Sequence, residues 1–272
     1  MFITLINDCF DENVKARLGT RVSALIGVTP TFVGVGGGLK SDNSKDPAEY
    51  ESAGCLIDTL DAAGDEKGII LVNVANRHGK GKKWPNGTPF GYFYVRNTLV
   101  VSTIDGLTLS LIKKLQLVQI IHLFDIPTVM RQLTVNKVLE KEQAEHITNT
   151  QFRSFEFQPR VAKWLIDGKN ISSIPYKINE VSDIPESVWF VDNFGNCKTT
   201  LLPKDIGFEI NKEISSEIGN FTCYSKLKDV PDGKKAITIG SSGYGNNRFL
   251  EIVIQGKSAS TELNLLSGSQ IF

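Results

Sequence analysis

The residues with the clearest chemical potential follow an apolar run, where Val188–Val191 gives way to the polar segment Asp192-Asn-Phe-Gly-Asn196. A strand that runs into such a loop indicates that the loop is held for a purpose. Asp192 and Asn196 could fix polar groups of a ligand, while Phe194 offers a flat face to a ring. The alternative is a hairpin turn in which the Asx side chains cap their own backbone. The residue types alone leave both possibilities open.

Two further polar loops follow expected strands, where ligands bind in doubly wound sheets. Asp8 follows the strand expected over Phe2–Ile6, and its carboxylate could bind both hydroxyls of a ribose or cap the next helix. His78 lies among glycines and lysines after the apolar run Gly68–Val74. It could act as a general base near neutral pH, or be an ordinary surface histidine. This loop has no GxxxxGK[ST] phosphate-binding pattern.

A glycine-rich segment near the end of the chain, Gly240–Ala259, feeds another expected strand. Its polar candidates for ligand binding are Asn246, Asn247 and Arg248. A flexible hairpin loop is the alternative interpretation. We predict no metal site in this chain.

The expected elements predict two domains. Strands and helical patterns alternate up to about residue 170, which favours an α/β domain with a largely parallel sheet over residues 1–170. Beyond it, alternating strands and glycine-rich turns favour an antiparallel β-barrel domain over residues 171–272. The main expected helices are Glu12–Leu25, Tyr50–Ala63, Leu107–Leu117 and Phe155–Asp167, and Gly91–Val95 with Thr98–Thr103 forms an expected hairpin.

Composition narrows the classes of function. Thirty basic and thirty acidic residues balance among 272, so nothing indicates nucleic acid or an anionic membrane as a partner. No apolar run is long enough to cross a bilayer, and the first residues are typical of a strand and not of a signal peptide. The four cysteines are scattered without CxxC spacing, as expected for reduced thiols in a cytoplasmic protein.

Two segments resemble those of the S-adenosylmethionine (SAM) hydroxide adenosyltransferases, relatives of the fluorinase and chlorinase. VDNFGNCKTT at residues 191–200 is similar to the family's IDxFGNxxTN, with Thr200 where the family usually has Asn. The stretch from Gly240 to Ala259 resembles NSxGxLEIAxxxGSA, with matches that include Gly256 and Ser258. The resemblance implies that the second of these segments contacts the methionine carboxylate and the adenine of SAM.

Three other segments resemble the family's motifs but depart from them. Asp8 matches the ribose-binding Asp of TDFGxxDxYV and Asp11 a methionine-binding position, although this chain is about two residues shorter there. The family's catalytic Asp, Arg and His fall on other residue types. They are Asn76, Lys83 and either Phe152 or, with a one-residue gap, Arg153, which puts Ser154 where the halogenases carry a halide-binding serine.

The resemblance implies that a nucleophile attacks C5′ of SAM and that methionine leaves. It also implies a SAM site between the two domains, a homotrimer, and no cofactor besides SAM as substrate or ligand. Three hypotheses follow: hydrolysis of SAM to adenosine and L-methionine with substitutes such as His78 and Lys83, halide transfer, or a protein that binds SAM or adenosine without catalysis.

Overall fold

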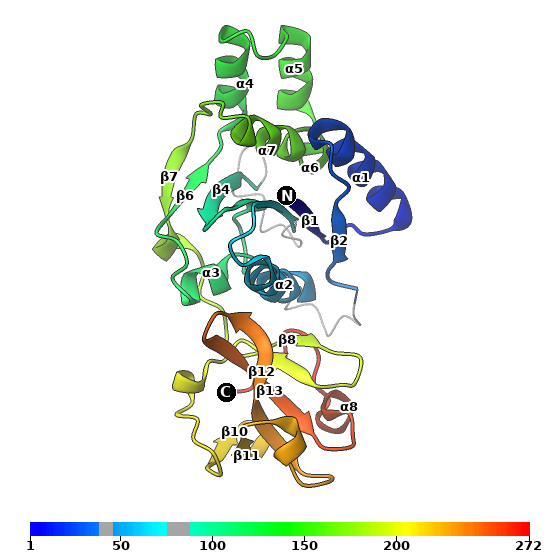
Figure 1. Ribbon diagram of the computed structural model, residues 1–272, viewed down its shortest axis with the longest axis vertical. Helices are drawn as coiled ribbons and strands as arrows, with labels where there is room; N and C mark the ends of the chain where they lie inside the picture. Colours follow the sequence, from blue (N-terminus) through cyan, green and yellow to red (C-terminus); the bar gives the residue numbers. More distant parts are fainter. Residues whose placement is uncertain (38–45, 75–87) are drawn as a thin grey trace. The chain divides into compact units, whose positions relative to one another are not determined.

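The computed structural model describes residues 1–37, 46–74 and 88–272. The chain forms two compact units, each assembled from three segments (Figure 1). Unit 1 contains Met1–Val35, Ala63–Gly106 and Gln116–Val181, and unit 2 contains Gly36–Ala62, Leu107–Leu115 and Ser182–Phe272.

Unit 1 is built on a seven-stranded sheet of order β2-β1-β3-β5-β4-β6-β7. The four strands β2, β1, β3 and β5 run parallel, as predicted, while β4, β6 and β7 extend the sheet with antiparallel pairs. The expected hairpin is therefore confirmed as β4 and β5. The strands are β1 Phe2–Asn7, β2 Thr31–Gly34, β3 Gly68–Asn73, β4 Phe90–Val95, β5 Thr98–Thr103, β6 Ile120–Leu123 and β7 Ile174–Lys177.

Helices of unit 1 pack on one face of this sheet. Alternate strand residues such as Ile3, Leu5, Ile69 and Leu71 share a core with apolar residues of α1, α4, α5 and α7, as the two-residue period of a strand requires. The bounds are α1 Glu12–Ile26, α4 Ile126–Val135, α5 Lys141–Asn149, α6 Arg153–Glu156 and α7 Gln158–Ile166.

The helix expected over Phe155–Asp167 is divided into α6 and α7. Phe157 joins the two with a backbone φ of −94° and ψ of −53°, and a proline occupies the first turn of α7. Proline lacks a backbone N–H and is tolerated in the first turn of a helix but not in its interior. Pro159 therefore fixes where the second helix begins.

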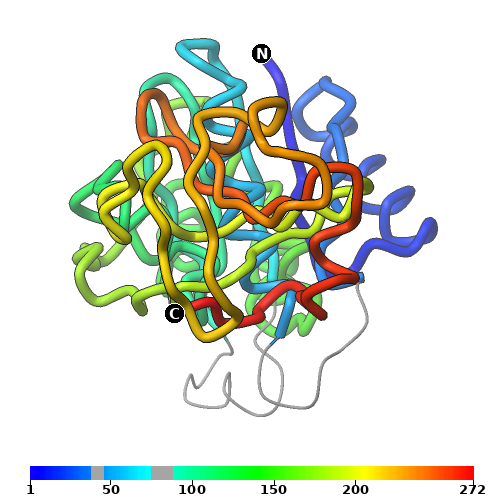
Figure 2. Tube along the Cα trace, turned by 90° about the horizontal axis from the view of Figure 1, so that it is seen from below, coloured from blue at the N-terminus to red at the C-terminus, as the bar shows by residue number. Residues whose placement is uncertain are grey.

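Unit 2 contains a six-stranded sheet of order β10-β11-β12-β13-β9-β8, antiparallel apart from the β11–β12 pair. The antiparallel C-terminal sheet is confirmed, and its closure into a barrel stays a prediction. Figure 2 shows the C-terminal segment (red) beside the β10–β11 turn (yellow), where Glu217 N donates to Ile271 O at 3.3 Å. The strands are β8 Val188–Val191, β9 Cys197–Thr199, β10 Glu213–Ser216, β11 Gly219–Tyr224, β12 Lys235–Tyr244 and β13 Asn247–Ile254.

Unit 2 also includes most of α2, Pro47–Ala63, a helix predicted for the N-terminal domain. Gly54 of α2 packs directly on the ring of Trp189, which is 2% exposed. The compact units thus differ from the predicted division at residue 170. The remaining helices are α3 Ser110–Lys114 and α8 Ala259–Leu263, with short 3-10 turns at Ile178–Glu180 (η2), Pro203–Asp205 (η3) and Leu227–Asp229 (η4).

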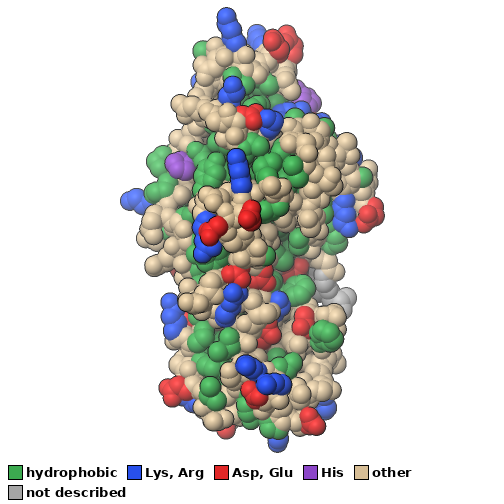
Figure 3. Space-filling view, in the orientation of Figure 1, with side chains coloured by type: hydrophobic (Ala, Val, Ile, Leu, Met, Phe, Trp, Pro, Cys, Tyr) green, Lys and Arg blue, Asp and Glu red, His purple; other side chains and the backbone are tan. Residues whose placement is uncertain are grey.

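The distribution of charged side chains on the surface agrees with the equal numbers of basic and acidic residues in the sequence. On the face shown in Figure 3, basic and acidic side chains are interspersed. Among the residues described, no helix has the length and apolar character to cross a membrane.

Candidate functional site

The loop between β8 and β9 is held by Asp192. Its Oδ1 accepts hydrogen bonds from the backbone N–H groups of Phe194 and Asn196, both at 2.9 Å, and its Oδ2 accepts from Asn196 Nδ2 at 3.1 Å. This is the self-capping Asx turn that the sequence left as one of two possibilities. Asp192 therefore shapes the loop, and the shape leaves the ring of Phe194 72% exposed.

Gly195 lets this loop approach the start of α8. Its φ is +83°, and a Cβ at this position would lie 2.1 Å from Ser258 Oγ. Ser260 N donates to Gly195 O at 2.9 Å, and Ser258 Oγ caps α8 by accepting from Thr261 N at 3.1 Å. Only glycine adopts this conformation without strain and leaves room for the serine.

A groove of about 510 Å³ opens beside this loop in unit 2. Three residues predicted to bind substrate share its lining: Phe194, Asn196 and Gly256. It joins an exposed aromatic ring to an amide and to backbone polar groups, a combination that suits a flat heterocycle with donors and acceptors on its edge. The rest of the lining is Leu227, Ile254, Gln255, Lys257 and Ser258.

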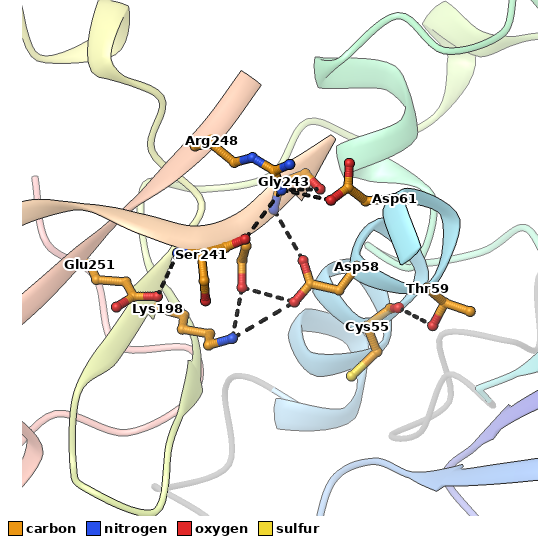
Figure 4. Close-up of polar contacts among 10 residues, drawn as sticks. Cys55, Asp58, Thr59, Asp61, Lys198, Ser241, Gly243, Arg248 and Glu251 are labelled. Atoms are coloured by element: carbon orange, nitrogen blue, oxygen red, sulfur yellow. Dashed lines mark hydrogen bonds and ion pairs between the residues drawn. The ribbon is translucent and has the colours of Figure 1, made fainter. Parts of the chain in front are cut away.

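The structure places Asn246, Asn247 and Arg248 elsewhere, at the turn between β12 and β13. Arg248 Nη1 donates to Asp61 Oδ2 of α2 at 2.7 Å (Figure 4). Asn246 and Asn247 are exposed at the turn. None of the three lines the groove, so their predicted binding role is not supported by the groove's geometry.

Next to the Arg248–Asp61 pair, charged and polar side chains of α2 and of the unit 2 sheet form a half-buried hydrogen-bond network. Asp58 accepts from Ser242 Oγ at 2.8 Å and from Gly243 N at 3.1 Å, and Lys198 donates to Ser242 Oγ at 2.8 Å (Figure 4). Burial raises the pKa of Asp58, and it also raises the pKa of Glu251, in spite of the nearby Lys198 charge.

In unit 1, polar residues gather at the carboxyl ends of β1 and β3. Asn7 Oδ1 accepts from Cys9 N at 2.9 Å and from Asn73 Nδ2 at 3.2 Å, and Asp8 N donates to Asn73 O at 3.3 Å. The alternative that Asp8 caps the next helix is wrong, because Asp11 is the N-cap of α1 and accepts from Val14 N at 3.0 Å. Ribose binding by Asp8 and methionine binding by Asp11 stay predictions.

The predicted catalytic residues divide into two groups. Asn76, His78 and Lys83 lie outside the described residues. Arg153 and Ser154 open α6 and are half-buried. Burial lowers the pKa of the Arg153 guanidinium, which still carries its charge at neutral pH.

Comparison with known proteins finds a family model that matches the C-terminal part of the chain. Residues 186–272 match the family model of the SAM hydroxide adenosyltransferase C-terminal domain. The C-terminal part of the chain is therefore similar to the C-terminal domain of the SAM hydroxide adenosyltransferases. The matched segment contains the β8–β9 loop and the whole lining of the groove.

Two crystal structures resemble the complete chain. An uncharacterized conserved protein from Thermotoga maritima is 16% identical with a TM-score of 0.65, and the match covers all of both chains. A conserved hypothetical protein from Thermus thermophilus is 17% identical with a TM-score of 0.62, over all of this chain and 99% of the other. At such identities the likeness shows the fold alone. The search of curated proteins found no match.

Several residues that line the groove were not predicted from the sequence. Leu227 lies on the short 3-10 turn after β11, far from both motifs in the sequence. Ser258 was matched to the family motif but not chosen as a site residue. Its place directly before α8 as an N-capping serine is a signal that could have identified it.

The raised pKa of Glu251 gives a testable pH dependence. Because the folded protein disfavours the ionised carboxylate, the contribution of Glu251 to stability is largest at acidic pH and is lost as the pH rises through its folded-state pKa. Glu251→Gln keeps an acceptor for Ser241 N and is expected to increase stability at pH 7 but not at pH 4. Urea unfolding at both pH values measures this, and an equal effect at the two would contradict it.

Proposed function

We propose that this protein binds SAM and transfers its adenosyl group to water, giving adenosine and L-methionine. The single observation that carries the proposal is the groove in the family-matched domain, where an exposed aromatic ring and an amide meet. SAM is the substrate, and the proposal needs no further cofactor. By family resemblance we propose a homotrimer, to be checked by sedimentation.

Adenine fits the groove by its shape and by the pattern of its polar atoms. Phe194 offers a face on which the base can stack. Because Asn196 Nδ2 donates to Asp192, the amide oxygen is left to accept a hydrogen bond from the exocyclic amino group of adenine. Asp192 thus orients the Asn196 amide so that its oxygen can accept a hydrogen bond from adenine.

The reaction needs positioning more than acid catalysis. A water oxygen forms a bond to C5′ while the C5′–S bond breaks. The electron pair of the C5′–S bond stays on sulfur, so methionine leaves as a neutral thioether. The water loses a proton, so a base or a positive field assists the attack. His78 with Lys83 is our proposed source of that assistance, and the half-buried Arg153 is a further cation for the developing hydroxide.

A specific observation favours a second candidate, a SAM- or adenosine-binding protein without catalysis. Where the family has its catalytic histidine, this chain has Phe152 or Arg153. The histidines in the described part of the chain are engaged elsewhere, His122 stacked on Tyr92 and His146 beside Glu156. Halide transfer is a third candidate, because a halide needs no base and Ser154 is available to hold it.

Phe194→Ala is expected to weaken the binding of SAM and adenosine about tenfold, since removing an aromatic platform from a stacked base costs on the order of 1–3 kcal/mol. Phe194 is 72% exposed, so the variant is expected to fold normally. Isothermal titration with each ligand measures the change.

The matched control is Ile210→Ala, which also removes an exposed apolar side chain of unit 2 but lies outside the groove lining. Unchanged affinity in the Phe194 variant, or the same loss in both variants, would place the ligand elsewhere. It would leave the similarity to the family model intact.

A further inference from the structure

In unit 1, guanidinium groups from α1 and α7 and an imidazole from α5 lie around one carboxylate of α6, that of Glu156. Arg21 Nη1 and Arg160 Nη1 both donate to Glu156 Oε2, at 3.0 and 2.7 Å. His146 Nε2 lies 3.7 Å from the other oxygen. The Glu156 side chain is only 12% exposed, so this arrangement is largely shielded from water.

The neighbouring ring of Phe155 brings in a third guanidinium. The guanidinium carbons of Arg17 and Arg21 lie 5.0 and 4.2 Å from the ring centroid, in the range of cation–π contacts. In the part of the chain that the structure describes, Arg17 has no salt bridge, nor does Arg153 one turn earlier on α6. The positive charge is therefore concentrated and only partly neutralised.

One carboxylate cannot balance these groups. Arg17, Arg21 and Arg160 with Glu156 leave an excess of two positive charges. Two acidic residues nearby in sequence are already paired, Glu12 with Lys15 at 2.7 Å and Glu145 with Lys141 at 3.8 Å. Arg21 and Arg160 are half-buried and Arg17 is exposed, and like charges held this close repel one another unless an anion compensates them.

The pKa values of Glu156 and Arg160 also reflect the concentration of positive charge around them. Burial favours the protonated form of Glu156, but the charges of Arg160 and Arg21 outweigh it and lower its pKa. Burial, followed by the charge of Arg21, lowers the pKa of Arg160. The guanidinium groups of Arg21 and Arg160 therefore repel each other, although both remain charged at neutral pH.

We propose that this cationic cluster, defined as Arg17, Arg21, Arg160 and Phe155, binds the phosphate group of a small molecule. A phosphate dianion matches the excess of two charges, and guanidinium groups match phosphate oxygens in pairs. The cluster belongs to unit 1 and shares no residue with the groove of unit 2. It is therefore separate from the proposed adenine-binding groove, although α6 also carries Arg153 and Ser154 of the proposed catalytic set.

The test is calorimetric titration of the full chain with inorganic phosphate, and separately with uridine monophosphate, at low ionic strength with chloride as the counterion. Phosphate is expected to bind once per chain. Arg17→Ala is expected to weaken it about tenfold or more, the size of a lost charge-assisted hydrogen bond. Arg17→Lys keeps the positive charge but loses the two-pronged geometry of the guanidinium. Its phosphate affinity is expected to lie between those of the parent protein and the Arg17→Ala variant.

Lys15→Ala is the matched control, because it removes one positive charge from the same helix and Lys15 pairs with Glu12 outside the cluster. Tighter binding of uridine monophosphate than of phosphate would assign a nucleotide, and equal binding would assign the phosphate group alone. Equal losses of phosphate affinity in the Arg17→Ala and Lys15→Ala variants would show that only the net charge of the protein matters. That result, or no binding of phosphate at millimolar concentration, would overturn the proposal.

Discussion

Asp192→Ala is expected to weaken the binding of SAM and adenosine by about tenfold or more. The substitution removes all three hydrogen bonds that fix the β8–β9 loop, two from backbone N–H groups and one from Asn196 Nδ2. Each bond to a charged acceptor contributes about 1.5–3 kcal/mol, part of which is recovered from water in an exposed loop. Without them Phe194 and Asn196 lose their common orientation. Isothermal titration with adenosine measures the loss.

Two companion variants make this result specific. Asp192→Asn keeps one oxygen for the backbone donors but cannot satisfy both the backbone and Asn196 Nδ2, so an intermediate loss is expected. Asp232→Ala removes an exposed carboxylate elsewhere in unit 2 and is expected to bind normally. An Asp192→Ala protein that binds adenosine as tightly as the parent would show that the loop does not shape the site.

Gly54→Ala is expected to destabilise the protein by about 1–3 kcal/mol, the usual cost of overpacking a core. A Cβ at this position would lie 2.1 Å from the ring of Trp189, a side chain that is 2% exposed and has little room to move. The methyl group must therefore separate α2 from β8. Urea denaturation followed by tryptophan fluorescence measures the change in the free energy of unfolding.

Gly19→Ala is the matched control, since it makes the same change within another helix, α1, where a Cβ meets nothing within 4 Å. Alanine there is expected to stabilise the protein by roughly 0.5–1 kcal/mol, because it restricts the unfolded chain more than glycine does. Opposite signs for the two substitutions support the packing of α2 within unit 2. Two stabilising substitutions would contradict it.

The fold was predictable where local patterns decide it. The continuous apolar run Gly68–Val74 predicts a buried parallel strand, and β3 is one. Helix ends were predictable from capping chemistry only in part, because Asp8 and Asp11 both precede α1 and only the geometry selects Asp11. The membership of α2 in unit 2 depends on contacts such as Gly54 with Trp189, 135 positions later by their numbers, and no periodicity reports them.

The candidate site was predictable where one segment carries it. Phe194 and Asn196 of the Asp192–Asn196 loop were predicted to bind a ligand, because strand-to-loop transitions with such residues are typical of binding loops. Both line the groove, and their contact with a ligand stays a prediction. Arg248 was one of the polar candidates of the Gly240–Ala259 segment, and in the structure it pairs with Asp61 outside the groove. The sequence gives no sign of that pair, since residues so far apart meet only through the tertiary fold.

Hydrolysis of SAM is tested by chromatography of the products that purified protein forms from SAM, with and without excess chloride. We predict adenosine and methionine in equal amounts, above the spontaneous background and insensitive to chloride, with much slower turnover in a His78→Ala variant. No product from a protein that retains SAM would contradict hydrolysis and support the binding protein instead. A chlorinated nucleoside that appears only with chloride would contradict water as the nucleophile.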